Sequence, residues 1–459
     1  MPEQEADILI ESSGTQMYEF IEQLFPICRS ITGNGVRKTL RAIKEHLPGL
    51  EIHEVPTGER CFDWEIPKEW NISDAYVQDE NGKKIIDFKE HNLHVLNYSL
   101  PVNKEVTLEE LDEHLYSFPD KPDVIPYVTS YYEPRWGFCL PHNQRKQLKK
   151  GTYNVCIDSS LETGSLTYAD LLIPGETNQE VLISTYVCHP SLCNDNLSGV
   201  SLVTFLAKKI QKLQNFYSIR FLFVPETIGA ITWIASNEKK ISQIKYGLVV
   251  TCVGTPSKFT YKKTKKGNSF LDNAVIDVLE KSNVDFQIVD FFPYGSDERQ
   301  FCSPGINLNV GSIYRSDNKY LEYPEYHSSG DNFSIISEKA LDETFSIYYK
   351  IIMDLVKNSY KEKERDIENF KIKDKNLMYL NLFPKCEPQL SKRGLYRTIG
   401  GTTIESDKEI FNQLAYLWIL NYSDGKYSLK DIADISKIDL EVIRKSAILL
   451  ENKKLLKKI

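Results

Sequence analysis

The spacing of apolar residues changes along the chain, and each change indicates a different kind of structure. Residues 17–47 carry apolar side chains at helical spacing in two stretches, separated by a turn-forming Thr-Gly-Asn-Gly sequence at 32–35. Between about 56 and 161 the chain is rich in aromatic residues and proline, and its short alternating runs predict a small β-rich unit. From 164 onwards, apolar runs typical of strands alternate with helical patterns, which indicates an α/β sheet.

The C-terminal part has a third pattern. It begins after the charged run KEKERD at 361–366, which cannot build a core alone. Helical patterns then follow at 409–421, 429–436 and 439–456, separated by short turns. This spacing is typical of a winged-helix or helix-turn-helix unit.

These patterns divide the 459 residues into three domains, which suits a chain too long for one ordinary core. We expect a discontinuous α/β domain made of residues 1–55 and 162–365, with a mixed sheet flanked by helices. The β-rich domain at 56–161 is inserted into it, and a winged-helix-like domain follows at 371–459.

Charge and composition argue against several classes of function. The chain has 64 acidic and 56 basic residues, so no overall basic field draws it onto nucleic acid or anionic lipid. The N-terminus lacks the pattern of a signal peptide, and no apolar run approaches the ~20 residues that span a bilayer. We therefore expect a cytoplasmic protein with no membrane partner. The nine cysteines form no CxxC pair, which suits reduced thiols.

Candidate catalytic residues occur where predicted strands end. His189 follows one strand, Asp195 comes just before the next predicted helix, and Glu226 follows the next strand. In open α/β sheets the carboxyl ends of strands meet at one edge, where ligand crevices lie. We expect these three side chains to converge there. A second histidine, His327, lies in the loop before the last helix of the α/β domain.

Two imidazoles and a carboxylate are a familiar zinc triad that leaves a coordination position for water, and a free glutamate beside it can take a proton from that water. The constellation indicates a zinc-dependent hydrolase. Taken singly, each residue has a plainer interpretation. Asp195 would be a helix N-cap and His189 a strand-end residue bonded to backbone. Glu226 would be an ordinary carboxylate at a helix start, and His327 a solvated loop residue. Cys188 and Cys193 could supply thiolates, but we interpret them as small core residues and leave them outside the site.

Further charged groups follow another predicted strand. The sequence GSDERQ at 295–300 contains Asp297 and Arg299, which could bind a polar end of a substrate. A plain surface turn is the alternative.

Four sequence blocks together resemble the M28-like zinc aminopeptidase family of domain-of-unknown-function 4910. They are HPSLCNDNLSG at 189–199, PETIGA at 225–230, GSDERQFCSPG at 295–305 and YHSSGDN at 326–332. The resemblance covers nearly the whole chain, since the aromatic-rich stretch is similar to the inserted domain of unknown function 2172 and the family also carries a C-terminal winged helix. It implies a zinc-exopeptidase-like fold, and relatives are often labelled polysaccharide-biosynthesis proteins with an aminopeptidase-like domain.

The resemblance also assigns roles to residues. It matches three zinc ligands of typical M28 peptidases, namely His189, Asp195 and His327, and it matches Glu226 to the general base. Asp297 matches an aspartate that lines the active site near the substrate. The step from Asp195 to Asn196 matches a turn that carries a cis peptide bond in M28 enzymes.

Two ligands of the usual pair of zinc ions are missing. Thr227 stands where M28 enzymes have the second glutamate of a Glu-Glu pair, and Thr251 lies near the position of a strand-end aspartate. The resemblance therefore implies one zinc ion per chain, held by His189, Asp195 and His327.

The leading hypothesis is hydrolysis of an amide bond near a free terminus of a peptide or small amide. One alternative keeps the site but acts on an N-acyl sugar or conjugate. Another is a catalytically decayed peptidase fold that senses a ligand or binds DNA through the winged helix. Residues 430–459 carry eight basic and five acidic side chains, a surplus too small to favour nucleic acid as a partner. The sequence leaves a homo-oligomer open.

Overall fold

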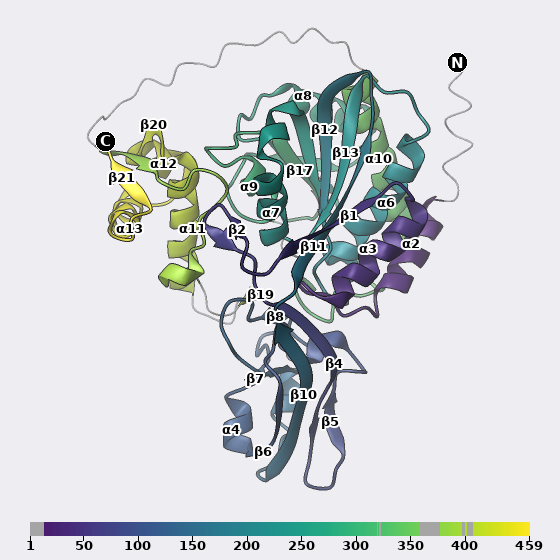
Figure 1. Cartoon of the computed structure of the whole chain (residues 1–459), viewed down its shortest axis with the longest axis vertical. Coiled ribbons are helices and arrows are strands. Elements are labelled where there is room, and N and C mark those ends of the chain that lie inside the picture. Colours follow the sequence, from purple (N-terminus) through teal and green to yellow (C-terminus); the bar gives the residue numbers. More distant parts are fainter. Residues whose placement is uncertain (1–12, 319, 321–322, 358–376, 397–399, 402–406) are drawn as a thin grey trace.

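The computed structural model describes residues 13–318, 320, 323–357, 377–396, 400–401 and 407–459. Within them, a large mixed sheet with helices on both faces forms the body of the molecule (Figure 1). A four-stranded sheet extends from it as a stalk, and a three-stranded sheet with its helices lies to one side. The predicted fold class is confirmed, while the domain boundaries at 56 and 161 remain a prediction.

The large sheet has eight strands in the order β1-β11-β13-β12-β14-β17-β15-β16. They are β1 (Glu51–Pro56), β11 (Ser165–Ile173), β12 (Thr177–Tyr186), β13 (Tyr217–Val224), β14 (Ile244–Val250), β15 (Phe259–Lys262), β16 (Phe286–Val289) and β17 (Val310–Arg315). The central strands β13, β12, β14 and β17 are parallel, and β11 and β15 flank them in the antiparallel sense. The ends of β12 and β13 therefore lie side by side, with Tyr186 opposite Val224.

Helices cover both faces of this sheet (Figure 1). One face carries α2 (Ser13–Leu24), α3 (Asn34–His46), α6 (Gly199–Ile210), α8 (Phe270–Lys281) and α10 (Glu338–Lys357). The other carries α7 (Ile228–Ser236), the 3-10 turn η3 (Glu238–Gln243) and the short α9 (Glu298–Phe301). On β13, Phe221 and Phe223 pack into the first core and Leu222 and Val224 into the second, because successive strand residues point to opposite faces. This double burial explains the continuous apolar run that predicted the strand.

The stalk is an antiparallel sheet in the order β5-β4-β10-β6, formed from the predicted β-rich stretch. Its strands are β4 (Glu69–Gln78), β5 (Lys84–Asp87), β6 (Val102–Thr107) and β10 (Thr152–Glu162). The same stretch of sequence also forms shorter elements, which are β2 (Arg60–Cys61), β3 (Trp64–Glu65), η1 (Asn92–His94), α4 (Leu108–Asp112), β7 (Leu115–Tyr116), β8 (Val128–Thr129), β9 (Phe138–Cys139) and α5 (His142–Arg145). Of these, β2 lies beside the body rather than in the stalk (Figure 1). Helix α4 is short, because the chain turns after Asp112 and pairs as β7 with β9.

The C-terminal part is a winged helix, as predicted. It contains β18 (Met378–Asn381), η5 (Ser391–Arg393), α11 (Asp407–Tyr422), β20 (Asp424–Ser428), α12 (Leu429–Ser436), α13 (Leu440–Asn452) and β21 (Leu456–Lys458). Strand β19 (Gly400–Gly401) pairs with β8 of the insert at the junction of body and stalk (Figure 1). The predicted boundary between 365 and 371 lies outside the described residues. Among the helices that the structure describes, none is long and apolar enough to cross a bilayer.

Candidate active site

The three predicted metal ligands meet at the carboxyl edge of the large sheet. His189 follows β12, Asp195 lies in the tight turn η2 (Cys193–Ser198) ahead of α6, and His327 lies in the loop between β17 and α10. Their ligand atoms all lie within 4.8 Å of one another. His327 Nε2 is 3.0 Å and His189 Nε2 is 4.0 Å from Asp195 Oδ2. We call these three residues the His-Asp-His cluster.

The turn that carries Asp195 is fixed by its neighbours rather than by capping α6. The backbone N–H groups of Asn194 and Asp195 donate to the two oxygens of Asp331, over 2.6 and 2.9 Å. Asn196 Nδ2 donates to Thr185 Oγ1 over 2.8 Å. The peptide bond between Asp195 and Asn196 is cis, as the resemblance implies. The carboxylate is therefore held toward the two histidines.

The cluster fits a metal ion. Asp195 Oδ2 is fully buried, and no hydrogen bond of normal geometry with the described residues satisfies it. Burial lowers the pKa of His189 to about 4, so its imidazole is neutral at neutral pH. Burial acts to raise the pKa of Asp195, but the neighbouring histidines lower it to about 2 and keep it ionised. A neutral imidazole and an ionised carboxylate are the protonation states in which these groups bind zinc.

Tyr186 lies in contact with the cluster and was not identified from the sequence. Its hydroxyl donates to Asp195 Oδ1 and lies 2.6 Å from Thr251 Oγ1. One oxygen of Asp195 is therefore used by Tyr186, and only Oδ2 faces the histidines. The sequence signal that could have identified Tyr186 was its position at the end of the strand that leads to His189.

Glu226 lies beside the cluster, at the end of β13. Its Oε2 atom is 3.9 Å from His189 Nε2, and 24% of the side chain is exposed. Burial, together with the charge of Asp297, raises the pKa of Glu226 well above its ordinary value, which suits a general base. The Glu226 backbone N–H donates to Cys188 Sγ over 3.2 Å, so this thiol contacts the backbone of Glu226.

Asp297 and Arg299 both contact Thr227, the residue after Glu226. Asp297 is 1% exposed, and its Oδ1 accepts the Thr227 N–H over 2.7 Å. Burial raises the pKa of Asp297 to about 7. Arg299 donates through a terminal nitrogen to Thr227 Oγ1 over 2.9 Å and through Nε to Glu387 over 2.9 Å. These contacts place both residues next to the base, and their role in binding substrate remains a prediction.

The insert contributes aromatic residues to the site. The ring of Tyr127 lies edge-on to both histidines, with centroids 5.1 Å from His189 and 5.4 Å from His327. The Tyr127 backbone N–H donates to His327 O over 2.8 Å, and its hydroxyl is 2.8 Å from that of Tyr131. Tyr326, which directly precedes His327, stacks on the His327 ring, with the two ring centroids 3.9 Å apart. The aromatic composition of the insert gave no indication of these contacts.

Comparison with known proteins agrees with this arrangement. A family described as Domain of unknown function (DUF4910) matches residues 18–358, and a winged helix-turn-helix family matches residues 377–458. The chain belongs to the DUF4910 family. This DUF4910 protein is 52% identical over 445 residues to a Clostridium acetobutylicum protein, covering 97% of this chain and 96% of that one. The relative's name assigns it, provisionally, to polysaccharide biosynthesis with an aminopeptidase-like domain.

Solved structures show the same fold. The crystal structure of a provisionally named peptidase from Clostridium acetobutylicum is 48% identical, with a TM-score of 0.74, covering 99% of this chain and 100% of that one. A zinc aminopeptidase from Bacillus subtilis is 12% identical, with a TM-score of 0.57, covering 78% of this chain and 99% of that one. A peptidase M28 precursor from Shewanella amazonensis is 13% identical, with a TM-score of 0.56, covering 80% of this chain and 99% of that one. The DUF4910 protein thus shares the fold of M28-type zinc aminopeptidases.

The two positions where the resemblance lacks a carboxylate are both engaged by other side chains in the DUF4910 protein. Thr227 is bonded to Asp297 and Arg299, and Thr251 lies against Tyr186. Neither threonine offers a carboxylate oxygen.

Proposed function

We propose that this protein is a zinc-dependent hydrolase of the aminopeptidase type, which cleaves an amide bond near a free terminus of a peptide or small amide. The observation that supports it most strongly is the position of Glu226, whose carboxylate lies 3.9 Å from His189 Nε2 at the edge of the buried His-Asp-His cluster. A free carboxylate beside two imidazoles and an aspartate is the arrangement of a metal-assisted hydrolase.

One zinc ion per chain, held by His189, Asp195 and His327, is part of this proposal. Bound there, zinc would polarise the scissile carbonyl and lower the pKa of a water molecule. The hydrogen bond from Tyr186 to Asp195 Oδ1 supports one ion rather than two, because it leaves Oδ2 as the oxygen of Asp195 that would hold a metal beside the histidines. The absence of carboxylates at Thr227 and Thr251 supports the same number.

The chain's own residues then carry the proton. Glu226 accepts a proton from the attacking water while the water oxygen bonds to the carbonyl carbon. It then gives that proton to the amide nitrogen as the carbon–nitrogen bond breaks. Tyr127 and Tyr326 pack against the histidines and fix the planes of the imidazoles.

The substitution Glu226→Gln tests the role of the base. A panel of aminoacyl p-nitroanilides, short peptides and N-acyl amino sugars identifies a cleaved substrate with the wild-type protein. We expect E226Q to lower kcat by about 100- to 10,000-fold while the zinc content stays unchanged. Glu176→Gln, at an exposed position just before β12 and so at the opposite end of that strand from His189, serves as the control and retains activity. Full activity in E226Q contradicts the proposed role.

The same panel separates two substrate classes. The name of the Clostridium acetobutylicum relative, with its reference to polysaccharide biosynthesis, favours an N-acyl sugar or conjugate as the second candidate. Cleavage of the N-acyl amino sugars without cleavage of the peptides supports that alternative. For both substrate classes, the proposal includes a cytoplasmic location of the protein.

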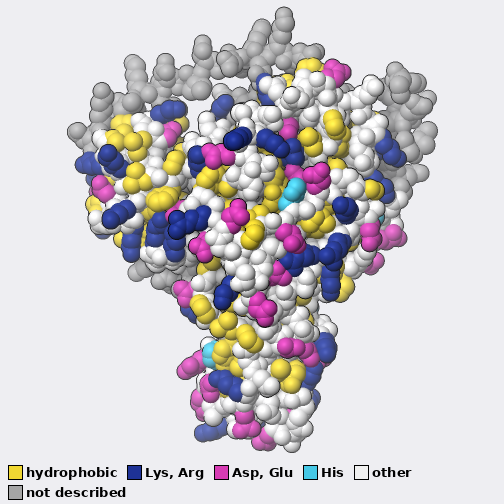
Figure 2. All heavy atoms as spheres, viewed as in Figure 1, with side chains coloured by type: hydrophobic (Ala, Val, Ile, Leu, Met, Phe, Trp, Pro, Cys, Tyr) yellow, Lys and Arg dark blue, Asp and Glu magenta, His cyan; other side chains and the backbone are white. Residues whose placement is uncertain are grey.

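A regulatory role through DNA has weaker support. Ile448, on the helix α13 that corresponds to a recognition helix, is 54% exposed, and Arg444 on the same helix pairs with Glu441 over 2.7 Å. On the face shown in Figure 2, acidic side chains lie among the basic ones over all three parts of the described chain. A gel shift that weakens steeply with salt would support DNA binding.

A further inference from the structure

Residues 382–396, which follow β18, lie directly against the part of the body that carries Asp297 and Arg299. The Cys386 N–H donates to Ser303 Oγ over 2.8 Å, and the Glu387 N–H donates to Gln300 Oε1 over 2.9 Å. Cys386 is 1% exposed. These bonds join the winged-helix part to α9 and to the loop that follows it.

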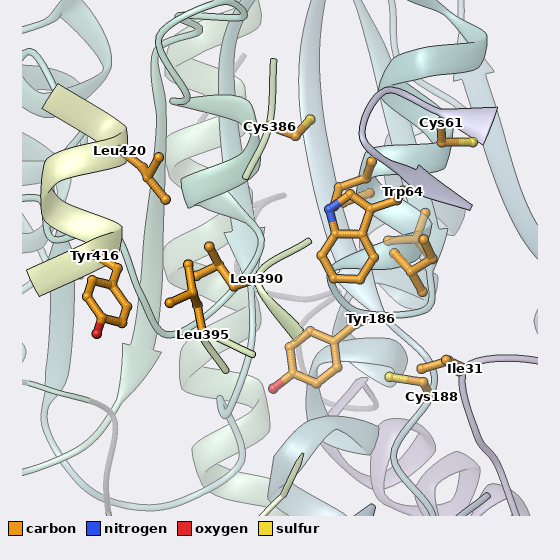
Figure 3. Packing of buried hydrophobic residues seen from close by; sticks show 14 of the residues in the cluster. Ile31, Cys61, Trp64, Tyr186, Cys188, Cys386, Leu390, Leu395, Tyr416 and Leu420 are labelled. Atoms are coloured by element: carbon orange, nitrogen blue, oxygen red, sulfur yellow. The ribbon is translucent and has the colours of Figure 1, made fainter. Parts of the chain in front are cut away.

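The same stretch is held from its other side by the β2–β3 hairpin. Trp64 Nε1 donates to Glu387 O over 2.8 Å. The Asp63 carboxylate pairs with Arg393 at 2.6 Å and with Lys392 at 2.9 Å. Figure 3 shows the apolar side of this contact, where Leu390 lies between the α11 residues Tyr416 and Leu420 and the ring of Trp64. The stretch is therefore fixed on both sides.

Glu387 is the residue of this stretch that points toward the site. Its carboxylate pairs with Arg299 Nε at 2.9 Å, and the side chains are only 16% and 12% exposed. The Arg299 guanidinium also donates to Thr227 Oγ1 over 2.9 Å, and Thr227 directly follows Glu226. A continuous chain of bonds therefore runs from the winged-helix part to the general base.

Thr227 needs such support, because its backbone has a φ of +62°. A β-branched residue rarely adopts this conformation, and it persists only where the surroundings fix it. Asp297 holds the Thr227 N–H, and Arg299 holds its hydroxyl. Without Glu387, Arg299 would keep its bonds to the Gly295 and Ser296 carbonyls but lose the carboxylate that holds its Nε.

We infer that Glu387 is a positioning residue of the active site, which acts through Arg299 and Thr227 to hold Glu226 in place. The winged-helix part is on this view a structural component of the catalytic centre. The inference rests on the proposed function for its kinetic consequence, but the bonding chain can be tested without turnover. An isolated surface ion pair would have little effect, whereas this one is nearly buried and continues into the site.

The test compares Glu387→Ala with Glu238→Gln in the full chain. Glu238 pairs with Lys385 of the same stretch, so E238Q removes another tie of this stretch without touching Arg299. Hydrogen–deuterium exchange is followed in the peptide covering 225–231. We expect exchange there to be about tenfold faster in E387A and unchanged in E238Q.

The kinetic test uses a substrate that the wild type cleaves. We expect E387A to lower kcat by about 10- to 100-fold, while KM changes by no more than about twofold and the zinc content is retained.

The outcomes separate the two claims. Unchanged exchange at 225–231 in E387A contradicts the positioning role, whether or not any substrate is cleaved. Faster exchange with a wild type that cleaves nothing supports the bonding chain and contradicts the proposed function. If E387A fails to fold, Glu387→Gln retains the volume and the backbone bonds, and its exchange decides in the same way. Equal effects in E238Q and E387A mean that the stretch acts as a whole, which also contradicts a specific role for Glu387.

Discussion

Tyr186 donates its hydroxyl hydrogen to Asp195 Oδ1, the carboxylate oxygen that does not face the two histidines. The two oxygens of one buried carboxylate thus have different partners. Oδ2 lies 3.0 Å from His327 Nε2, whereas Oδ1 is engaged by a tyrosine that also contacts Thr251. Tyr186 thus connects Asp195 to Thr251, which lies near the position where the resemblance to M28 enzymes implies a metal-binding aspartate.

We predict that Tyr186→Phe weakens zinc binding. The hydroxyl orients Asp195, and removing such a supporting hydrogen bond lowers metal affinity by about 10- to 100-fold. Competition with a chelator of known zinc affinity measures the change. Tyr348→Phe is the control, because Tyr348 is also buried but donates to Ile313 O over 2.6 Å, away from the cluster. Equal zinc affinity in Y186F and the wild type would show that Tyr186 does not orient Asp195.

A second prediction concerns the turn that carries Asp195. A Cβ atom on Gly199 would lie 2.4 Å from Asn196 Oδ1, and the Asn196 side chain holds the turn against Thr185. Gly199→Ala should therefore cost about 1–3 kcal/mol of unfolding free energy and weaken zinc binding as well. Chemical unfolding and the chelator titration measure the two effects. Gly151→Ala is the control, since the nearest atom to its Cβ would be 3.8 Å away. A G199A protein with unchanged stability would contradict this account of the turn.

The body of the fold was predictable because its strands are buried on both faces. Central strands such as β13 are continuous apolar runs, and the alternation with helices was equally clear. The strands β18, β20 and β21 were missed, since they are only 4, 5 and 3 residues long. Their pairing depends on contacts between distant parts of the chain.

The site was predictable where motifs follow strand ends, as for His189 and Glu226. The contributions of Tyr127 and Glu387 were not, because each comes from another part of the chain and reaches the site only through tertiary packing. Arg299 shows an intermediate case. Its motif was recognised, but nothing in the local sequence indicates that it bonds Thr227 on one side and Glu387 on the other.

The contact between the body and α11 should depend on pH. Lys265 Nζ donates to Asn421 O over 2.7 Å and lies 4.7 Å from the Tyr422 ring centroid. Burial lowers the pKa of Lys265 to about 8, below its ordinary value of 10.5. Between these values the unfolded chain binds more protons than the folded one, so this lysine's contribution to stability rises with pH.

We therefore expect the wild type to gain about 2 kcal/mol relative to Lys265→Met between pH 7 and about 9.5. Chemical unfolding of both proteins at the two pH values measures this difference. Lys263→Met is the control, because Lys263 pairs with Asp290, whose side chain is 89% exposed. A difference between wild type and K265M that stays constant with pH would contradict a buried, charged lysine at this contact.

The central claim is a single zinc ion in the His-Asp-His cluster, and elemental analysis of the purified protein tests it most directly. The wild type should contain about one zinc per chain, with no second equivalent taken up from excess zinc. His189→Ala and His327→Ala should each lose it, while His142→Ala, on the short helix α5 of the insert, should keep it. A wild type without metal, or one that holds two zinc ions per chain, would contradict the account.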